Sequence, residues 1–330
     1  MLAKFKSIRI ITWLAALLLA LSVFTQLPVA TLSESMANLS LMQWLIWVIL
    51  NFLIILVLVA RWQILANALG LSVDFTSLFL IRQAGQLVSF ITPGPQFGGE
   101  PLQVYWLWKN YRVPGHAALL AVGLDRFFEL WINFAVLLFA ILALLLTATI
   151  DTNTWNVVAF ILTLLILVLS ILGWIFISHP EMISRGLQRL AGRWQQNPVL
   201  GKLDTQWGLI SSNLLVLTSR HKRSLLFAFM LSVVGWAGMF SEIWLLLTFF
   251  DPTPDFTGFI VLFVAIRLAF LLPLPGGIGT LEAAVFWACQ GLGLAGTAAL
   301  GLIVLMRLRD AVVMTAGLLA LRYLNSYQPR

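Results

Sequence analysis

Long apolar runs separated by short polar segments form the main pattern of this chain. A membrane-spanning helix needs about 20 predominantly apolar residues. Runs of this kind occupy residues 8–27, 41–60, 117–148, 156–178, 224–250 and 296–322. None of them alternates between apolar and polar residues in the manner of an outer-membrane β-barrel strand. The pattern therefore predicts an all-α polytopic membrane protein with about six full spans.

Two further apolar stretches, 75–112 and 256–291, are interrupted by clusters of proline and glycine. Proline removes a backbone hydrogen-bond donor and glycine weakens a helix, so each helix is expected to break at its cluster. The arms that follow the breaks are too short to cross a bilayer comfortably. We therefore predict two broken helical hairpins, with arms at 75–91 and 101–112, and at 256–273 and 281–291.

The two breaks share one sequence skeleton. Residues 90–101 read FITPGPQFGGEP, and residues 272–283 read LPLPGGIGTLEA. In both, a Pro-Gly pair is followed by further glycine and by a glutamate seven residues after the proline. The residues expected to shape the turns are Pro93, Gly94, Gly98, Gly99, Pro275, Gly276, Gly277 and Gly279.

The difference in residue number between the two skeletons also relates the apolar runs that flank them. It relates the span at 41–60 to the span at 224–250. It also relates the span at 117–148 to the span at 296–322. An odd number of membrane crossings lies between the two copies of this pattern. The second copy is therefore expected to have the opposite orientation in the membrane. This predicts an inverted-topology repeat with hairpins entering from opposite faces, an arrangement that many transporters use.

The predicted layout is a single integral membrane domain. Its parts are a first span with an outer loop (8–40), a first repeat (41–148), a connecting span with a basic inner loop (149–223), and a second repeat (224–325). Within the inner loop, residues 181–194 place apolar side chains on one helical face beside Arg185, Arg189 and Arg193. This indicates a helix lying flat on the inner leaflet, with a plain solvated loop as the alternative.

Composition supports a membrane location, and charge sets the orientation. The chain is 61% hydrophobic and 10% charged, whereas soluble domains carry about 25% charged residues. The net charge of +7 fits basic loops retained on the cytoplasmic side better than it fits nucleic-acid binding. The segments predicted inside are both termini, 61–74 with Arg61, and 179–223, and those predicted outside are 28–40, 149–155 and 251–255. We expect a multi-pass protein of a bacterial-type cytoplasmic (inner) membrane.

Charged residues also occur within the apolar segments, where each would be costly against lipid. The arginines are Arg82, Arg126, Arg267, Arg307 and Arg309, and the carboxylates are Glu100, Asp125, Glu129, Glu242, Glu282 and Asp310. Their similar numbers predict pairing. Asp125–Arg126 and Arg309–Asp310 are sequence neighbours and do not face each other along a helix. We therefore expect partners on other elements, such as Glu100 and Glu282.

These charges suit an anionic head group, because arginine binds phosphate with two parallel hydrogen bonds. Helix starts near the two turns also present free N–H groups to an anion. The candidate substrate-binding residues are Glu100, Glu282, Arg126, Arg307 and Arg309, followed by Arg82, Arg267, Asp125 and Asp310. The alternative is that the same residues form static salt bridges that fasten the hairpins to the spans.

Other chemistry is not indicated by the sequence. There is no Walker loop and no G-x-S-x-G motif, which argues against ATP hydrolysis or a nucleophile elbow. The single cysteine, Cys289, excludes an intramolecular disulfide framework and a multi-cysteine metal site. The histidines lack partners at metal-ligand spacing. We therefore expect no cofactor, no metal and no catalytic residue.

Several of these segments resemble one known family. The segments TPGPQFGGEP, LDRFFEL, PLPGGIGTLEA and VLMRLRDAV are similar to those of the lysylphosphatidylglycerol synthase transmembrane domain family. This is the flippase domain of the multiple peptide resistance factor and its stand-alone relatives. The likeness covers about residues 8–325. One departure is Pro95-Gln96-Phe97, where the family pattern has a glycine-richer turn.

The resemblance implies an inner-membrane protein that moves a lipid between leaflets. Full-length members add a soluble domain that transfers an aminoacyl group from tRNA to phosphatidylglycerol, and the sequence predicts no such domain or synthase activity here. The expected function is translocation of an anionic or modified phospholipid or a lipid-linked head group. The alternatives are a membrane enzyme that uses Glu or Asp as general acid or base on such a head group, and a scaffold for lipid-modifying partners. The expected partners are membrane lipids and not nucleic acid, and homo-oligomerisation stays open.

Overall fold

The computed structural model describes residues 36, 39–92, 98–147, 152–178, 198–250 and 254–326. Every regular element among these residues is a helix. The helices are α3 (Leu41–Ala68), α4 (Phe75–Ile91), α5 (Glu100–Tyr111), α6 (Gly115–Leu146), α7 (Thr152–Ser178), α9 (Pro198–Arg220), α10 (Lys222–Thr248), α11 (Phe256–Ala269), the 3₁₀ turn η1 (Pro275–Gly277), α12 (Thr280–Gly291) and α13 (Gly296–Ser326). The prediction of an all-helical protein is confirmed for the described residues.

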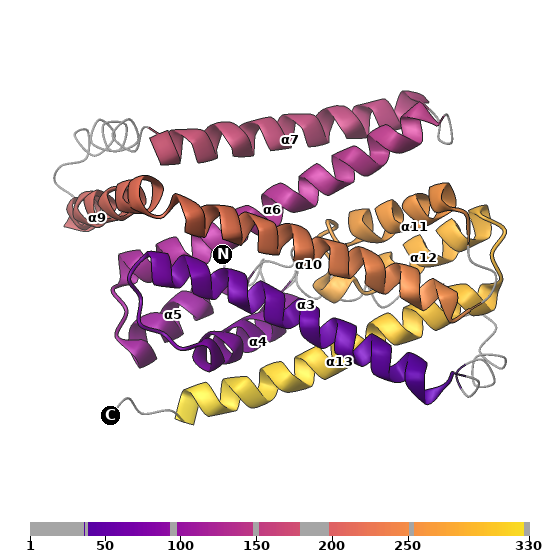
Figure 1. The fold of residues 1–330 in the computed structure, drawn as a ribbon, viewed down its shortest axis with the longest axis horizontal. Coiled ribbons are helices and arrows are strands. Elements are labelled where there is room, and N and C mark those ends of the chain that lie inside the picture. Colours follow the sequence, from indigo (N-terminus) through magenta and orange to yellow (C-terminus); the bar gives the residue numbers. More distant parts are fainter. Residues whose placement is uncertain are drawn as a thin grey trace, which may run out of the picture.

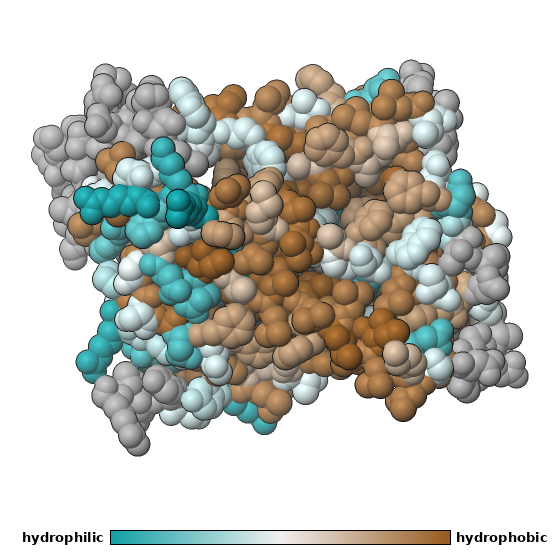
Figure 2. Space-filling model, viewed as in Figure 1, coloured by the Kyte–Doolittle hydropathy of each residue, from teal (hydrophilic) through white to brown (hydrophobic). Residues whose placement is uncertain are grey.

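The long helices run along the longest axis of the molecule (Figure 1). Those long and apolar enough to cross a membrane, among the described residues, are Leu41–Ala68, Gly115–Leu146, Trp155–Ile175 and Lys222–Thr248. Their outer faces leave large apolar side chains exposed, such as Phe139 and Phe160. Brown apolar surface accordingly fills the middle of Figure 2. Exposed apolar surface of this extent fits a lipid environment.

Four predicted spans correspond to these helices with ends that differ by a few residues, and two predicted spans do not. The run at 296–322 lies in α13, a continuous helix of 31 residues whose charged residues set it apart from the other spans. The run at 8–27 lies outside the described residues, as does the helix predicted at 181–194. The predicted count of about six spans therefore stays a prediction.

The predicted inner loop at 61–74 is wrong in part, because α3 continues to Ala68 and the connection to α4 comprises only residues 69–74. The polar residue that suggested a loop, Arg61, is completely buried and ion-paired with Asp125. A buried charge is tolerated within an apolar helix when it is paired in this way.

The predicted loop at 179–223 is also wrong in part, since α9 occupies Pro198–Arg220. Ile210, Leu214 and Leu217 of this helix are buried. Their spacing places them on one face of the helix. Ile210 and Leu214 pack with Leu120 of α6. Burial of this apolar face stabilises a helix in a segment that was predicted to be part of a basic inner loop.

At the places of the predicted hairpin arms, α4 contacts α5 and α11 contacts α12. Helix α11 ends at Ala269 rather than at the predicted 273, and the prediction of re-entrant hairpins stays a prediction. The α4–α5 pair lies toward one end of the molecule and the α11–α12 pair toward the other end (Figure 1). Their first arms begin alike, because Asp74 caps α4 and Asp255 caps α11 through side-chain hydrogen bonds. The Ser77 hydroxyl donates a hydrogen bond to Asp74 and lowers the pKa of that carboxyl.

Packing between helices that are distant in the sequence brings the turn η1 against α4. Helix α3 packs along α10, α4 packs along α13, and α11 contacts α6. The turn η1 contacts α4, and the Phe90 ring occupies the space that a side chain at Gly276 would fill. Gly276 has φ of 56°, in the left-handed region that favours glycine. The turn η1 therefore lies against the last turn of α4.

Within the first hairpin, α4 and the start of α5 touch through glycine. A Cβ atom at Gly99 would overlap the carbonyl of Gly85. We expect Gly99→Ala to lower the free energy of unfolding by about 1–3 kcal/mol, because the backbones must separate. Denaturant titration in detergent micelles measures this change. Gly123→Ala is the matched control, since nothing lies within 4 Å of a Cβ at Gly123, and equal effects of the two changes would contradict the prediction.

Candidate functional site

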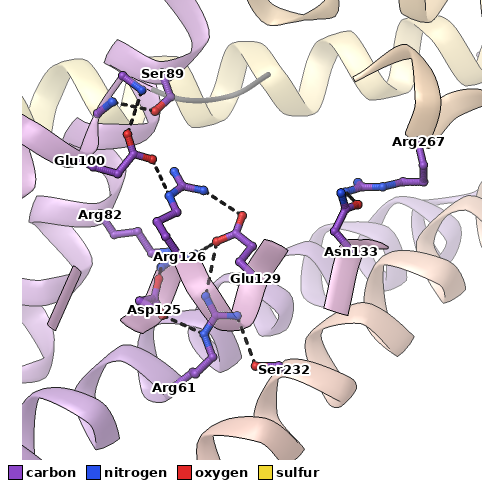
Figure 3. Close-up of polar contacts among 12 residues, drawn as sticks. Arg61, Arg82, Ser89, Glu100, Asp125, Arg126, Glu129, Asn133, Ser232 and Arg267 are labelled. Carbon is purple, nitrogen blue, oxygen red and sulfur yellow. Dashed lines mark hydrogen bonds and ion pairs between the residues drawn. The ribbon is translucent and has the colours of Figure 1, made fainter. Parts of the chain in front are cut away.

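Ion pairs at mid-fold join residues from helices that are far apart in the sequence. In the first cluster, Asp125 of α6 accepts hydrogen bonds from Arg61 Nε at 2.7 Å and from Arg82 Nη1 at 2.8 Å. All three side chains are buried. Figure 3 shows Arg61 and Arg82 converging on α6 from α3 and α4. The cluster therefore ties these three helices together.

One turn further along α6, Glu129 joins the same arginines. Its Oε2 lies 3.4 Å from Arg61 Nη2 and 3.4 Å from Arg82 Nη2. Its Oε1 accepts a hydrogen bond from Arg126 Nη1 at 3.0 Å. Arg61 also donates to Ser232 of α10. Each charged group of this cluster thus has an oppositely charged partner, as buried charges require.

The first hairpin turn is linked to this cluster through Glu100. Arg126 Nε and Glu100 Oε1 form an ion pair at 2.5 Å. The other carboxylate oxygen of Glu100 accepts the N–H of Gly98 at 2.8 Å, and the N–H of Gly99 donates to Ser89 at 3.0 Å. The glutamate therefore holds both the turn backbone and an arginine of α6 (Figure 3).

The second hairpin turn is held in the same way by Glu282. This carboxylate accepts the N–H of Gly279 at 2.7 Å and Arg307 Nε of α13 at 2.7 Å. Arg307 also donates to the carbonyls of Gly276 at 2.9 Å and Gly277 at 3.0 Å. The predicted pairing of both hairpin glutamates with arginines on other elements is confirmed by these contacts.

Arg309 continues the second cluster toward α10. Its Nη1 donates to Glu242 at 2.8 Å and its Nη2 donates to Asp310 at 3.1 Å. Asp310 also accepts from Arg307 at 3.1 Å. The expectation that Arg309 and Asp310 do not pair is therefore wrong, because the long arginine side chain reaches the neighbouring carboxylate on its own helix.

Arg267 of α11 differs from the other buried arginines. Its Nη2 donates to the Asn133 side chain at 3.0 Å, and its guanidinium carbon lies 4.3 Å from the centre of the Trp236 ring. The buried Nε has no hydrogen-bond partner. Among the residues that the structure describes, no carboxylate lies within ion-pair distance of Arg267. It is separated from the carboxylates in Figure 3 as well.

A cavity of about 200 Å³ lies where these groups meet. Its charged lining comprises Arg126, Glu129, Glu242, Arg267, Arg309 and Asp310. Apolar side chains of α3, α4, α10 and α13 form much of the rest. A second cavity of about 270 Å³ shares Arg126, Glu129, Trp236, Arg267 and Phe270 and continues between apolar residues of α6, of α7 and of the segment that follows α11. The arrangement can hold a charged group beside an apolar chain.

The structure divides the predicted site residues into two groups. Arg126, Arg267, Arg309 and Asp310 line the first cavity, as does the turn residue Gly276. Arg82, Glu100, Asp125, Glu282 and Arg307 are held in the ion pairs around the turns and are not among its lining residues. Pro93 and Gly94 lie outside the described residues, and so does the departure at 95–97.

Sequence reasoning missed part of this site. Arg61 was assigned to a loop, and Glu129 and Glu242 were recognised as intramembrane charges but not as site residues. Asn133 and Trp236, which contact Arg267, carried no signal, because a polar or aromatic residue within an apolar helix is compatible with simple packing. One sequence signal could have placed Arg61 in α3, namely a helical pattern of apolar residues that continues beyond position 61.

One comparison with known proteins covers the whole of this region. A family model described as the lysylphosphatidylglycerol synthase TM region matches residues 7–317. A UPF0104 membrane protein of Methanothermobacter thermautotrophicus is 23% identical over 264 residues, which are 74% of this chain and 74% of the relative. Another, of Methanocaldococcus jannaschii, is 33% identical over 93 residues, 28% of each chain. No solved structure matches the chain. The family match includes both hairpins and both charged clusters.

Proposed function

Because the chain belongs to the lysylphosphatidylglycerol synthase transmembrane region family, we propose that it is a lipid translocase of a cytoplasmic membrane. Its cargo is an anionic or modified phospholipid or a lipid-linked head group. The head group passes through the cavity between the two hairpins while the acyl chains stay in apolar surroundings. The observation that carries the proposal is a cavity lined by Arg126, Arg267 and Arg309 at the meeting point of two broken helices.

The two halves of the protein form an inverted repeat in this proposal. Helices α3 to α6 and α10 to α13 follow one another in the same order, each with a broken hairpin between two long helices. The first arm of each hairpin contacts the last long helix of the other half. Glu100 and Glu282 make corresponding contacts with a glycine N–H and an arginine. Such repeats allow one half to rock against the other around a central site.

The membrane orientation follows from basic residues at one end of the long axis. Teal side chains gather at the left of Figure 2, where α5, the α9–α10 junction and the end of α13 lie in Figure 1. The basic residues of these segments are Lys109, Arg112, Arg220, Lys222, Arg223 and Arg322. Short basic segments are retained in the cytoplasm, which supports assigning this end to the cytoplasmic side.

Arg267 is the expected phosphate-binding residue. A guanidinium binds phosphate through paired charge-assisted hydrogen bonds, and Arg267 has no carboxylate among the described residues that would compete with the ligand. Its stacking against Trp236 holds the group in place. Arg126 and Arg309 line the same cavity and add positive potential, although each is partly neutralised by its own carboxylates.

We expect Arg267→Gln to slow lipid translocation about 10- to 100-fold, the equivalent of a lost hydrogen bond to a charged group. The measurement is a leaflet-exchange assay in proteoliposomes that contain fluorescent phospholipids. Arg223→Gln, at an exposed site near the start of α10, is the matched control. Unchanged transport in folded Arg267→Gln would contradict the assigned role, and no transport of any phospholipid or glycolipid by the wild-type protein would overturn the function.

A further inference from the structure

The charged side chains that line the first cavity are balanced in number. The cations are Arg126, Arg267 and Arg309, and the anions are Glu129, Glu242 and Asp310. An anionic group that enters this cavity therefore brings one uncompensated negative charge into the interior. A buried charge without a partner is costly, and a titratable group in such a place changes its protonation instead. Binding of an anion therefore favours the uptake of one positive charge in the same cavity.

The excess of negative charge lies in the cluster around α13. This cluster contains two arginines and three carboxylates: Arg307, Arg309, Glu242, Glu282 and Asp310. The cluster around α6 has three of each: Arg61, Arg82, Arg126, Glu100, Asp125 and Glu129. Arg267 compensates the excess, because its own contacts are an amide and an aromatic ring. An anion bound to Arg267 removes this compensation.

Asp310 is the least tightly held carboxylate of the cluster around α13. Arg307 makes its shorter bond to Glu282, at 2.7 Å, and Arg309 makes its shorter bond to Glu242, at 2.8 Å. The bonds that Asp310 accepts from these two arginines measure 3.1 Å or more. Its side chain is 11% exposed, whereas those of Glu242 and Glu282 are each 3% exposed. Asp310 is thus the carboxylate that is easiest for a proton to reach.

The charged groups around Asp310 come from several helices. Those that bond to it, share its arginines or line the cavity with it are Arg307 and Arg309 of α13, Glu242 of α10, Glu282 of α12, Arg267 of α11, and Arg126 and Glu129 of α6. Helix α4, which packs along α13, contributes Gln86, Ser89 and Phe90 to the lining and no charged group. The arginines of this set other than Arg267 already pair with carboxylates. A proton is therefore the positive charge that Asp310 takes up directly.

We propose that Asp310 binds one proton when an anionic head group binds Arg267, and that the protein moves the lipid and the proton together. An O–H bond forms on the carboxylate with a proton from water on one side of the membrane, and it breaks when the proton returns to water on the other side. This proposal rests on the proposed function, since it adds a coupled ion to the same site. The loaded cavity then carries no net charge, which lowers the cost of changing conformation inside a bilayer.

The bonds of Asp310 connect its protonation to the second hairpin. Arg307 bonds to Asp310, and it also holds the carbonyls of Gly276 and Gly277. Arg309 bonds to Asp310 and to Glu242 of α10. A protonated Asp310 no longer attracts either arginine as an anion does. The turn η1 and α10 therefore respond to the same proton.

The test uses phosphatidylcholine proteoliposomes that carry a trace of phosphatidylglycerol with a fluorescent acyl chain. Equal potassium concentrations and valinomycin hold the membrane potential at zero while a difference of about one pH unit is imposed. One proton moving with each lipid predicts that the probe accumulates about tenfold in the leaflet on the alkaline side, because a tenfold ratio of proton activity drives it. A membrane-impermeant reductant measures the share of probe in the outer leaflet, and protein-free vesicles give the background.

A voltage experiment distinguishes this co-transport from movement of the anion alone. With equal pH on both sides, the lipid and the proton together carry no net charge. A membrane potential of about 100 mV is therefore expected to leave the probe evenly distributed. An anion that moves alone would concentrate on the positive side by more than about tenfold at this potential.

A substitution then assigns the proton to its residue. The amide of Asp310→Asn has nearly the shape of the carboxyl group but does not bind the proton, so we expect the pH-driven accumulation to disappear. Asp255→Asn is the matched control, because asparagine caps a helix about as well as aspartate and Asp255 is an exposed cap of α11. The control is expected to keep the accumulation.

The measurements on the wild-type protein need no variant, so a misfolded Asp310→Asn protein does not weaken them. Rapid exchange of the probe without pH-driven accumulation, or exchange of zwitterionic lipids alone, overturns the coupling and leaves the translocase standing. Absence of exchange for every phospholipid and glycolipid overturns both proposals. Accumulation that survives in folded Asp310→Asn overturns the assignment of the proton to this residue.

Discussion

Asp125→Ala is expected to lower the free energy of unfolding by about 3–5 kcal/mol, because it leaves buried arginines without their closest carboxylate. Arg61 and Arg82 both bond to Asp125 at less than 3 Å, and their contacts to Glu129 are longer, at 3.4 Å. The substitution therefore removes the closest carboxylate of two buried arginines, Arg61 and Arg82, at the same time. Denaturant titration in detergent micelles measures the change, with Asp74→Asn as a control at an exposed helix cap.

A double-mutant cycle separates this ion pair from general damage to the core. Arg61→Met combined with Asp125→Leu replaces the pair by apolar residues, and such replacement is often neutral or stabilising. We expect the double variant to be more stable than Asp125→Ala and the two single changes to be strongly non-additive. Additive effects would show that the pair is not coupled and would contradict the proposed arrangement.

Arg307→Gln is expected to loosen the second hairpin more than any other single change in α13. The variant removes the partner of Glu282 and weakens the hydrogen bonds to the carbonyls of Gly276 and Gly277. Breaking a buried ion pair in this way costs about 3–5 kcal/mol. Because the arginine holds the turn rather than the core, we expect local opening of α12 before the whole protein unfolds.

The lone cysteine provides a direct measurement of that opening. Cys289 is the single cysteine of the chain, it lies in α12, and it is 1% exposed. We expect its thiol-labelling rate to rise about 10- to 100-fold in Arg307→Gln, as for the loss of one or two bonds to a charged group. Arg322→Gln, near the other end of α13, is the control. An unchanged labelling rate in Arg307→Gln would show that the turn does not depend on this arginine.

The broken hairpins show how much of the fold local sequence chemistry determines. Helix α4 occupies the predicted arm at 75–91, whereas α11 ends at Ala269, before the predicted end at 273. The similarity of the two skeletons also placed Glu100 and Glu282 at corresponding positions, each beside an arginine of a long helix. Backbone propensities act over a few residues, so a sequence reveals them without knowledge of distant neighbours.

The apolar pattern was sufficient for the spans but not for their ends. Arg61 interrupted the hydrophobic run and suggested a loop, whereas α3 continues to Ala68. The difference comes from Asp125, which compensates the buried charge from another helix. Hydropathy counts each side chain as if it faced lipid or water, so it has no means of recognising compensation by a partner distant in the sequence.

The sequence by itself determined the membrane class, the breaks in two of the helices and the presence of intramembrane charges of both signs. Only the tertiary structure decided which charges are neutralised and which face the cavity. Arg126, Arg267 and Arg309 look alike in the sequence, but Arg267 alone among them has an amide and an aromatic ring in place of a carboxylate. The reason is that electrostatic pairing acts over a few ångströms in space, and helix packing, not chain order, sets those distances.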